Sequence, residues 1–355
     1  MNKIKKTAAL LMCFLLVGCS PKEKKSFQAS TLTAGFDTVI TLQLYADSQE
    51  AFNEEFQKVE NLFYYYHTLF DKYHLYEKNN IKTINDAAGK QPVQVDQELI
   101  DLLLIAKKYS ELSNHQFDVT LGPVLELWHD VREKAENQEP YALPSSFELQ
   151  KASLCTGWDK VDIDDDNNTV YLNTPCASLD VGAIAKGYAT QKVKDMLIQD
   201  GYTNGFINAG GNVQILGSKI NGDPWKTGIQ SPDPTKQGHS ILQFELKDAT
   251  AFVTSGDYQR YFIHNDQIIH HIIDPDTLYP ARHAKSVTIL CEDGTIADIL
   301  STTLYTMTYQ EGKDFINQLN MEIQVIWIYD KTDEIENENY IEKEGFYILS
   351  TKDLQ

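Results

Sequence analysis

Five short blocks of this 355-residue chain carry glycine, aspartate and small polar residues where a protein core would normally carry aliphatic side chains. The blocks span residues 178–190, 207–212, 254–256, 270–276 and 297–302. Adjacent glycines let backbone amides approach an anion closely. Asp298 and Thr302 stand four residues apart on a predicted helix, and a carboxylate beside a hydroxyl suits a hard cation such as Mg²⁺. Phosphates held by a glycine-rich loop and a metal are the parts of a phosphoryl-transfer site, so the blocks predict that chemistry.

The blocks also contain a candidate general base. His271 precedes an Asp-Pro pair in a β-rich stretch, and an imidazole that titrates near neutral pH can deprotonate a hydroxyl group. His270 is a competing assignment, and a structural histidine bonded to a strand carbonyl is an alternative for His271. The chain contains no P-loop, no G-x-G-x-x-G after a predicted strand, no H-E-x-x-H and no G-x-S-x-G, so the phosphate chemistry must use another scaffold.

Taken in order, these blocks resemble the ApbE family, the FAD:protein FMN transferases, over about residues 31–319. The resemblance implies an enzyme that binds FAD and Mg²⁺, moves FMN onto a threonine (or serine) of a partner protein, and releases AMP. Two other readings stay open. The same site could hydrolyse FAD to FMN and AMP, or the chain could be a lipid-tethered flavin- or solute-binding protein without catalysis.

The resemblance also assigns roles to individual residues. It implies metal ligation by the carbonyl of Ala183 and the side chains of Asp298 and Thr302, with Ser301 at a position that is a carboxylate in some relatives. It implies that His271 deprotonates the acceptor hydroxyl. The nucleotide and flavin would be bound by Phe36, Tyr73, Gln116, Phe117, Asp118, Asp180, Lys186, Asn208, Gly210, Gly211 and Ile273.

Purely structural roles remain as alternatives for several of these residues. Asp180 could simply cap the helix predicted over residues 182–199, Lys186 could be a solvated surface lysine, and residues 208–212 could form a tight turn. Residues 70–73 and 116–118 could be ordinary core or turn segments. Phe36 stands where relatives usually have methionine, which is the clearest departure from the family pattern.

The N-terminus predicts export. Three lysines among the first six residues precede a short apolar run that ends in Leu-Val-Gly-Cys at Cys19, which reads as a signal peptide over residues 1–18. This ending resembles a bacterial lipobox, with Cys19 lipidated. Residues 19–30 read as the lipidated cysteine and a flexible tether, and residues 31–355 as the catalytic domain. We therefore expect a protein on the extracytoplasmic face of the cell membrane, held only by a lipid anchor.

The net charge limits the kinds of molecule that the protein can bind, and the cysteine count bears on disulfide formation. The formal net charge of −20 disfavours binding to nucleic acid, so we expect the partners to be FAD and a membrane-associated or exported acceptor protein. A bridge between Cys155 and Cys176 is possible, but an odd cysteine count after Cys19 favours buried free thiols.

The spacing of apolar residues along the chain predicts the helices and strands that position the site. Apolar residues recur at helical spacing over residues 52–70 and 96–112, and helices are also expected over 182–199 and from about 297. Strands are expected near residues 38–45, 206–216, 240–246, 251–254, 258–264, 267–273, 286–291, 323–329 and 346–349, with a hairpin rather than a calcium loop over 161–171. Helices and antiparallel-looking strands without regular βαβ alternation predict an α+β fold. The family resemblance implies an ApbE-like (T-fold-like) architecture with largely antiparallel sheets in two intimately packed lobes.

Overall fold

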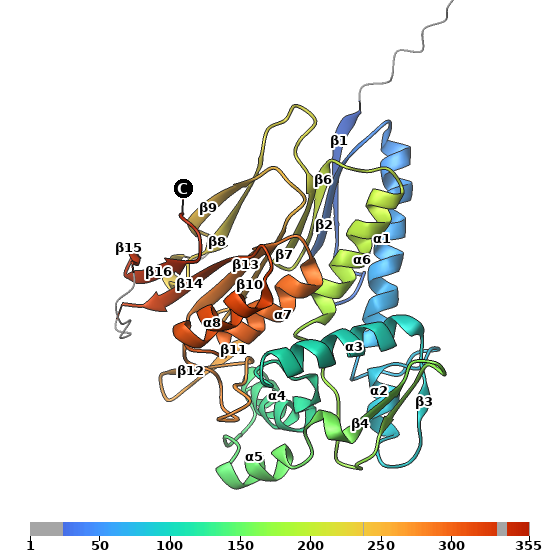
Figure 1. The fold of residues 1–355 in the computed structure, drawn as a ribbon, viewed down its shortest axis with the longest axis vertical. Coiled ribbons are helices and arrows are strands. Elements are labelled where there is room, and N and C mark those ends of the chain that lie inside the picture. The colour runs from blue at the N-terminus through green and yellow to red at the C-terminus, as the bar shows by residue number, and fades with distance from the viewer. Residues whose placement is uncertain (1–23, 237, 332–338, 355) are drawn as a thin grey trace, which may run out of the picture.

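A nine-stranded sheet forms the centre of the molecule (Figure 1). The computed structural model describes residues 24–236, 238–331 and 339–354; the predicted signal peptide and Cys19 lie outside these ranges. Every pairing in the sheet is antiparallel. In spatial order its strands are β1 (Lys25–Thr31), β2 (Ile40–Ala46), β6 (Gly205–Ala209), β7 (Asn212–Gly217), β10 (Ala251–Gly256), β13 (Ser286–Cys291), β14 (Gln324–Asp330), β16 (Phe346–Ser350) and β15 (Ile341–Lys343).

Both faces of this sheet are covered. One face packs against four helices: α1 (Gln49–Phe70), α6 (Ala185–Gln199), α7 (Gly294–Tyr305) and α8 (Tyr309–Leu319). The other face packs against a two-stranded sheet of β8 (Trp225–Gln230) and β9 (Ser240–Leu246). On β14, Trp327 accordingly faces the helices while Ile326 and Ile328 face β8 and β9. Burial on both faces explains why β13 and β14 read as almost continuous apolar runs.

A smaller lobe packs beneath the helical layer (Figure 1). Its helices are α2 (Ile81–Asp86), α3 (Gln97–Leu112), α4 (Gly122–Glu136) and α5 (Ser146–Ser153), and its sheet is β3 (Val93–Gln94), β5 (Thr169–Leu172) and β4 (Val161–Asp164). Short 3₁₀ turns cover Val119–Leu121, Trp158–Lys160 and Pro234–Lys236. A hairpin of β11 (Tyr261–His264) and β12 (Gln267–His270) leaves the main sheet and packs Phe262 and Ile269 against α4. The hairpin thereby closes the gap between the lobes.

The α+β fold class is confirmed, as is the hairpin over β4 and β5. The expected single strand over residues 206–216 is two strands joined by a turn at Gly210 and Gly211. Among the described residues, no helix is long and apolar enough to span a bilayer.

Two predictions from the sequence were wrong, one about the N-terminal tether and one about the cysteines. Residues 25–30 belong to strand β1 rather than to a flexible tether, because β2 supplies backbone partners along the whole strand and Phe27 stacks on Phe52 at 5.7 Å. Cys155 and Cys176 form a disulfide rather than free thiols, since the fold brings their Cα atoms to 5.5 Å; Cys291 is a buried free thiol, as expected.

Candidate active site

A cavity of about 650 Å³ lies where the two lobes meet, within the size range of small-molecule sites. Its walls come from the end of α1, the loop after it, α4, the start of α6, the middle and end of α7, the end of β10, and the β11–β12 hairpin. Most of the predicted site residues line it, namely Phe36, Tyr73, Gln116, Phe117, Asp118, Asp180, Ala183, Lys186, His271, Ile273, Asp298 and Thr302. Asn208, Gly210, Gly211 and Ser301 are not among the lining residues.

The floor of the cavity is the contact between α6 and α7. The amide of Gly187 donates a hydrogen bond of 2.8 Å to Oδ2 of Asp298, and a Cβ atom on Gly187 would lie 2.4 Å from both Asp298 Cβ and the carbonyl oxygen of Gly294. Only glycine therefore fits at position 187. The N-cap of α7 is Asp293, whose carboxylate accepts from the amides of Thr295 and Ile296. Asp298 is thus a buried mid-helix carboxylate, not the helix-start residue that the sequence predicted.

Asp298 is a suitable ligand for a cation. Burial raises the pKa of Asp298, while the nearby Lys186 ammonium and the amide of Gly187 act in the opposite direction. No lysine or arginine forms an ion pair with Asp298 within the described ranges, where clusters of three or more His, Cys, Asp or Glu side chains are also absent. Any cation here would be held by one carboxylate together with neutral oxygens.

Neutral oxygens are present beside Asp298. The Nδ2 group of Asn212 donates to Oδ1 of Asp298 at 3.3 Å, and in the described structure Oδ1 of Asn212 is buried without a partner. Ser301 turns away from the cavity, and its hydroxyl bonds to Ser255 Oγ (2.8 Å) and to the carbonyl of Asp298 (2.9 Å). Ser255, which does line the cavity, lies 3.3 Å from Oγ1 of Thr302.

Asp180 pairs with a lysine that the sequence did not single out. Lys72 Nζ lies 3.0 Å from Oδ2 of Asp180 and 3.3 Å from Glu126, and it sits over the ring of Tyr73 at 4.9 Å. Burial would raise the pKa of Asp180, but the charge of Lys72 and the amide of Gly182 outweigh it and hold this pKa below its usual value. The carboxylate accepts from the Gly182 amide at 2.9 Å, whereas α6 begins later, at Ala185, without a side-chain cap.

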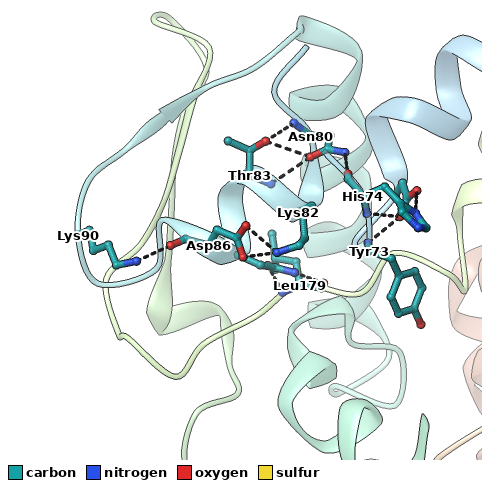
Figure 2. A network of polar contacts seen from close by, with 10 residues as sticks. Tyr73, His74, Asn80, Lys82, Thr83, Asp86, Lys90 and Leu179 are labelled. Atoms are coloured by element: carbon teal, nitrogen blue, oxygen red, sulfur yellow. Dashed lines mark hydrogen bonds and ion pairs between the residues drawn. The ribbon is translucent and has the colours of Figure 1, made fainter. Parts of the chain in front are cut away.

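Hydrogen bonds to two buried side chains, those of Asp71 and Asn80, hold the loop that carries Tyr73 in the wall of the cavity. Asp71 accepts from the amides of Tyr73 and His74 and from the Tyr76 hydroxyl. Figure 2 shows Asn80 between the loop and α2: its Nδ2 group donates to the carbonyls of Thr68 (3.0 Å) and His74 (2.9 Å).

A second set of hydrogen bonds fixes this wall, between Asn85 of α2 and Leu179. Asn85 donates to the carbonyl of Leu179 at 3.0 Å and accepts from its amide at 2.8 Å. Both backbone groups of the residue before Asp180 are therefore held by one side chain of α2, whose neighbourhood Figure 2 draws.

Residues 208–212 include the turn between β6 and β7, which consists of Gly210 and Gly211. Oδ1 of Asn208 accepts from the amide of Gly211 at 2.9 Å, Gly210 and Gly211 both have positive φ, and Gly210 packs against Thr38. This is the tight turn that the sequence left open, and it contributes to the site through Asn212.

The structure separates the two adjacent histidines. Nε2 of His270 donates to the carbonyl of Ala281 at 2.7 Å, and its Nδ1 accepts from the amide of Ile272 at 3.2 Å. Both nitrogens of this buried ring are therefore occupied. Both histidines line the cavity, but Nδ1 of His271 is buried without a hydrogen-bond partner among the described residues. Burial, helped by the charge of Arg260, lowers the pKa of His271 to about 3, so the imidazole is neutral, but it is a weaker base than the near-neutral titration predicted from the sequence.

Sequence reasoning missed Lys72, Ser255 and Arg260, all of which line the cavity. Ser255 and Arg260 lie in or near the 254–256 block, which marked the region without indicating which side chains face inward. No local pattern identified Lys72, because its partners Asp180 and Glu126 are distant in the sequence.

Fold and site together define an α+β enzyme whose inter-lobe cavity combines a buried carboxylate, convergent hydroxyls, cationic side chains and an unpartnered neutral imidazole. Comparison with known proteins gives the family. The sequence model described as the ApbE family matches residues 36–327, which is most of the chain. The chain belongs to the ApbE family.

Individual relatives agree with this assignment. The chain is 31% identical over 236 residues to the FAD:protein FMN transferase of Klebsiella pneumoniae, covering 66% of this chain and 70% of that protein. It is 28% identical over 308 residues to the FAD:protein FMN transferase of Vibrio cholerae, covering 86% and 88% of the two chains.

Solved structures give the same result. The crystal structure of the ApbE protein from Thermotoga maritima superposes with a TM-score of 0.73 at 31% identity, over 85% of this chain and 94% of that one. The flavin transferase ApbE from Vibrio cholerae has the same TM-score at 24% identity, over 92% and 97%, which shows a shared fold. The family and the ApbE-like fold predicted from the sequence are confirmed.

Proposed function

We propose that this chain catalyses Mg²⁺-dependent transfer of FMN from FAD to a threonine (or serine) hydroxyl of a partner protein and releases AMP. The observation that carries this proposal is that the unpartnered His271 imidazole lines the same cavity as Ala183, Asp298 and Thr302, the residues proposed to hold the cation. A binding protein has no need for a free base in the same cavity as a cation site. The names of the curated relatives support the same reaction.

The cation site fits Mg²⁺. Mg²⁺ is usually bound through one or two carboxylates together with substrate phosphates and waters, which matches a site with Asp298 as its one carboxylate. Asp298, Thr302 and the carbonyl of Ala183 would hold the ion, and the orphaned Oδ1 of Asn212 lies behind Asp298. When bound, the ion would neutralise charge on the pyrophosphate of FAD.

The remaining walls suit the rest of FAD. Lys186 is unpaired in the described structure and lies near Asp298, where it can contact a phosphate; burial lowers the pKa of this lysine, and the charge of Asp298 opposes that effect. Phe36, Tyr73 and Phe117 offer aromatic surfaces, and Gln116, Asp118, Asp180 and Ile273 complete the proposed FAD contacts. Phe36 packs edge-on against Phe63 and His67.

The chain's own contribution to the chemical step is proton transfer and positioning. The acceptor oxygen forms a bond to the phosphorus of the FMN half, the bond from that phosphorus to the AMP oxygen breaks, and the hydroxyl proton passes to His271. His270 cannot take this part, because both of its ring nitrogens are engaged.

The reaction is proposed to take place outside the cytoplasm, on a protein held to the membrane by lipid on Cys19. The Cys155–Cys176 disulfide supports export, because disulfides persist mainly in oxidising compartments. The acceptor would then be a membrane-associated or exported protein. Mass spectrometry of the mature N-terminus should find a lipid-modified Cys19, and an unmodified N-terminus would overturn the anchor.

The function is tested by incubating the full chain with FAD, Mg²⁺ and extracytoplasmic proteins from a strain that lacks it. Transfer predicts a flavin-fluorescent protein band that survives denaturing electrophoresis and is absent with His271→Asn. Free FMN without a band would indicate hydrolysis, and intact FAD would indicate binding alone; either result would refute the proposed transfer.

A further inference from the structure

Arg260 and His271 flank the open end of the β11–β12 hairpin. Tyr261 and His270 form the last pair of the antiparallel ladder at that end, so Arg260 and His271 are the residues just outside it. Paired residues in an antiparallel ladder have Cβ atoms about 4.5–5.5 Å apart, so the two chain segments leave the hairpin close together. Arg260 and His271 both line the cavity, together with Phe262 and Ile269 of the hairpin.

Arginine is scarce in this chain, and it is concentrated at the cavity. The sequence has only three arginines, Arg132, Arg260 and Arg282, among its 31 basic residues. Arg132 and Arg260 line the cavity, but Arg132 is engaged by His129 Nδ1 (2.8 Å) and lies 3.7 Å from Glu136. Arg260 is exposed and forms no ion pair or hydrogen bond within the described part of the chain.

Arg260 also acts on the two groups that face the expected pyrophosphate. After burial, its charge is the largest influence that lowers the pKa of His271, and it lowers the pKa of Lys186 as well. Three cationic side chains, those of Lys186, Arg132 and Arg260, line the cavity together with His271, and the charge of each lowers the pKa of His271. In a chain with a net charge of −20, such a concentration of positive charge calls for an anionic ligand.

We propose that Arg260 binds the phosphoryl group that is transferred, the phosphate of the FMN half of FAD, in the same cavity as the base that activates the acceptor. This inference rests on the proposed function and adds a residue to it. A planar guanidinium can hold two phosphate oxygens through a fixed pair of parallel hydrogen bonds, whereas a lysine ammonium acts as a point charge. Since the acceptor attacks the phosphorus beside His271 in the proposed reaction, Arg260, which flanks the same end of the hairpin and lines the same cavity, is placed to reach that phosphoryl group.

The role is a positioning and charge-stabilising one. As the acceptor oxygen bonds to phosphorus and the AMP oxygen departs, negative charge is spread over the non-bridging oxygens of the transferred group. Arg260 would neutralise that charge without exchanging a proton, because its guanidinium remains ionised.

The test compares Arg260→Gln and Arg260→Lys with Arg282→Gln in the full chain. Arg282 is a matched control: it is exposed, donates to Oε1 of Gln267 at 3.4 Å, and does not line the cavity. Two quantities are measured. The first is single-turnover flavin transfer at saturating FAD. The second is the affinity for FMN and for riboflavin, which lacks the phosphate, measured without Mg²⁺ by quenching of flavin fluorescence.

We expect Arg260→Gln to slow transfer by about 10²–10³-fold, the usual effect of removing one preorganised donor, with a smaller loss in Arg260→Lys and none in Arg282→Gln. Affinity for FMN should fall in Arg260→Gln while affinity for riboflavin stays unchanged. Equal loss for both flavins, or transfer equal to that of Arg282→Gln, would overturn the assignment. If the wild type transfers no flavin, the proposed function fails, but the FMN and riboflavin comparison still decides whether Arg260 binds the phosphate.

Discussion

The amide of Gly187 and the carboxylate of Asp298 are joined by a hydrogen bond of 2.8 Å across the α6–α7 contact. This bond aims one carboxylate oxygen at the backbone and leaves the other toward Asn212 and the cavity. Ala183, just before α6, lines the same cavity as Asp298 and Thr302 of α7. The geometry of the proposed cation site is therefore set by how closely two helices pack.

Asp298→Asn should abolish Mg²⁺-dependent transfer while leaving the fold nearly intact. The amide oxygen of asparagine can still accept from Gly187, but the side chain loses the charge that holds the cation. We expect transfer to fall by at least about 10²-fold, because charge stabilisation of this kind contributes several kcal/mol.

The measurement is transfer rate against Mg²⁺ concentration, with thermal unfolding as the check on folding. Asp298→Ala is a poorer variant, since it leaves buried donors without a partner at about 1–3 kcal/mol each. A wild-type rate in Asp298→Asn would contradict the assignment.

Gly187→Ala should destabilise the protein and weaken Mg²⁺ binding together. The added methyl group would lie 2.4 Å from backbone and Cβ atoms of α7, which cannot yield as a flexible side chain can. Overpacking of this kind costs about 1–3 kcal/mol, measurable by urea unfolding.

Gly312→Ala in α8 is the matched control for that substitution. Its nearest neighbour is the flexible Leu304 side chain at 3.2 Å, so its stability should change by less than about 1 kcal/mol. Equal effects of the two substitutions would show that the α6–α7 contact is no more sensitive to an added methyl group than α8 is.

Reducing the Cys155–Cys176 bridge should lower the free energy of unfolding by about 3 kcal/mol, as expected for a loop of 21 residues. Flavin transfer should survive, because Asn85 holds Leu179 and the adjacent Asp180 independently of the bridge. The measurement is urea unfolding with and without reductant. In the double variant Cys155→Ser/Cys176→Ser, reductant should have no further effect; an unchanged wild type would argue against the bridge.

Stability should fall as the pH drops from 7 to 5, in part through His270. Burial lowers the pKa of His270 to about 4 in the folded protein, whereas an unfolded histidine titrates near 6.5. Between these values the unfolded chain binds a proton that the folded chain does not, so acid favours unfolding and the loss ends below about pH 4.

At pH 5 this single group should account for a loss of about 2 kcal/mol relative to pH 7. Between pH 7 and pH 5, the unfolding free energy of His270→Gln should therefore fall by about 2 kcal/mol less than that of the wild type. His271, whose pKa is also lowered, contributes equally in both proteins. Parallel pH profiles would show that His270 is not buried in its neutral form.

Much of this molecule was predictable from local pattern. The helical spacing over residues 52–70 gave α1, and the spacing of Asp298 and Thr302 placed both on α7 at the cavity. These features depend on residues that are close in the sequence. The ordered blocks were specific enough to predict the family.

What could not be predicted depends on pairing between distant segments. Strand β1 has only two apolar side chains facing the core and owes its structure to β2. The two adjacent histidines both line the cavity, and only the tertiary contacts show that both ring nitrogens of His270 are engaged while Nδ1 of His271 has no partner among the described residues. The partnership of Lys72 with Asp180 likewise exists only once the lobes are packed.

The most direct test of the central claim is the stoichiometry of the products. With the full chain, FAD, Mg²⁺ and an acceptor identified from the fluorescent band, we predict one AMP released for each FMN bound covalently to the acceptor, with little free FMN. His271→Asn should suppress both products together. AMP release matched by free FMN, with no flavin on the acceptor, would contradict the claim and identify the enzyme as an FAD hydrolase.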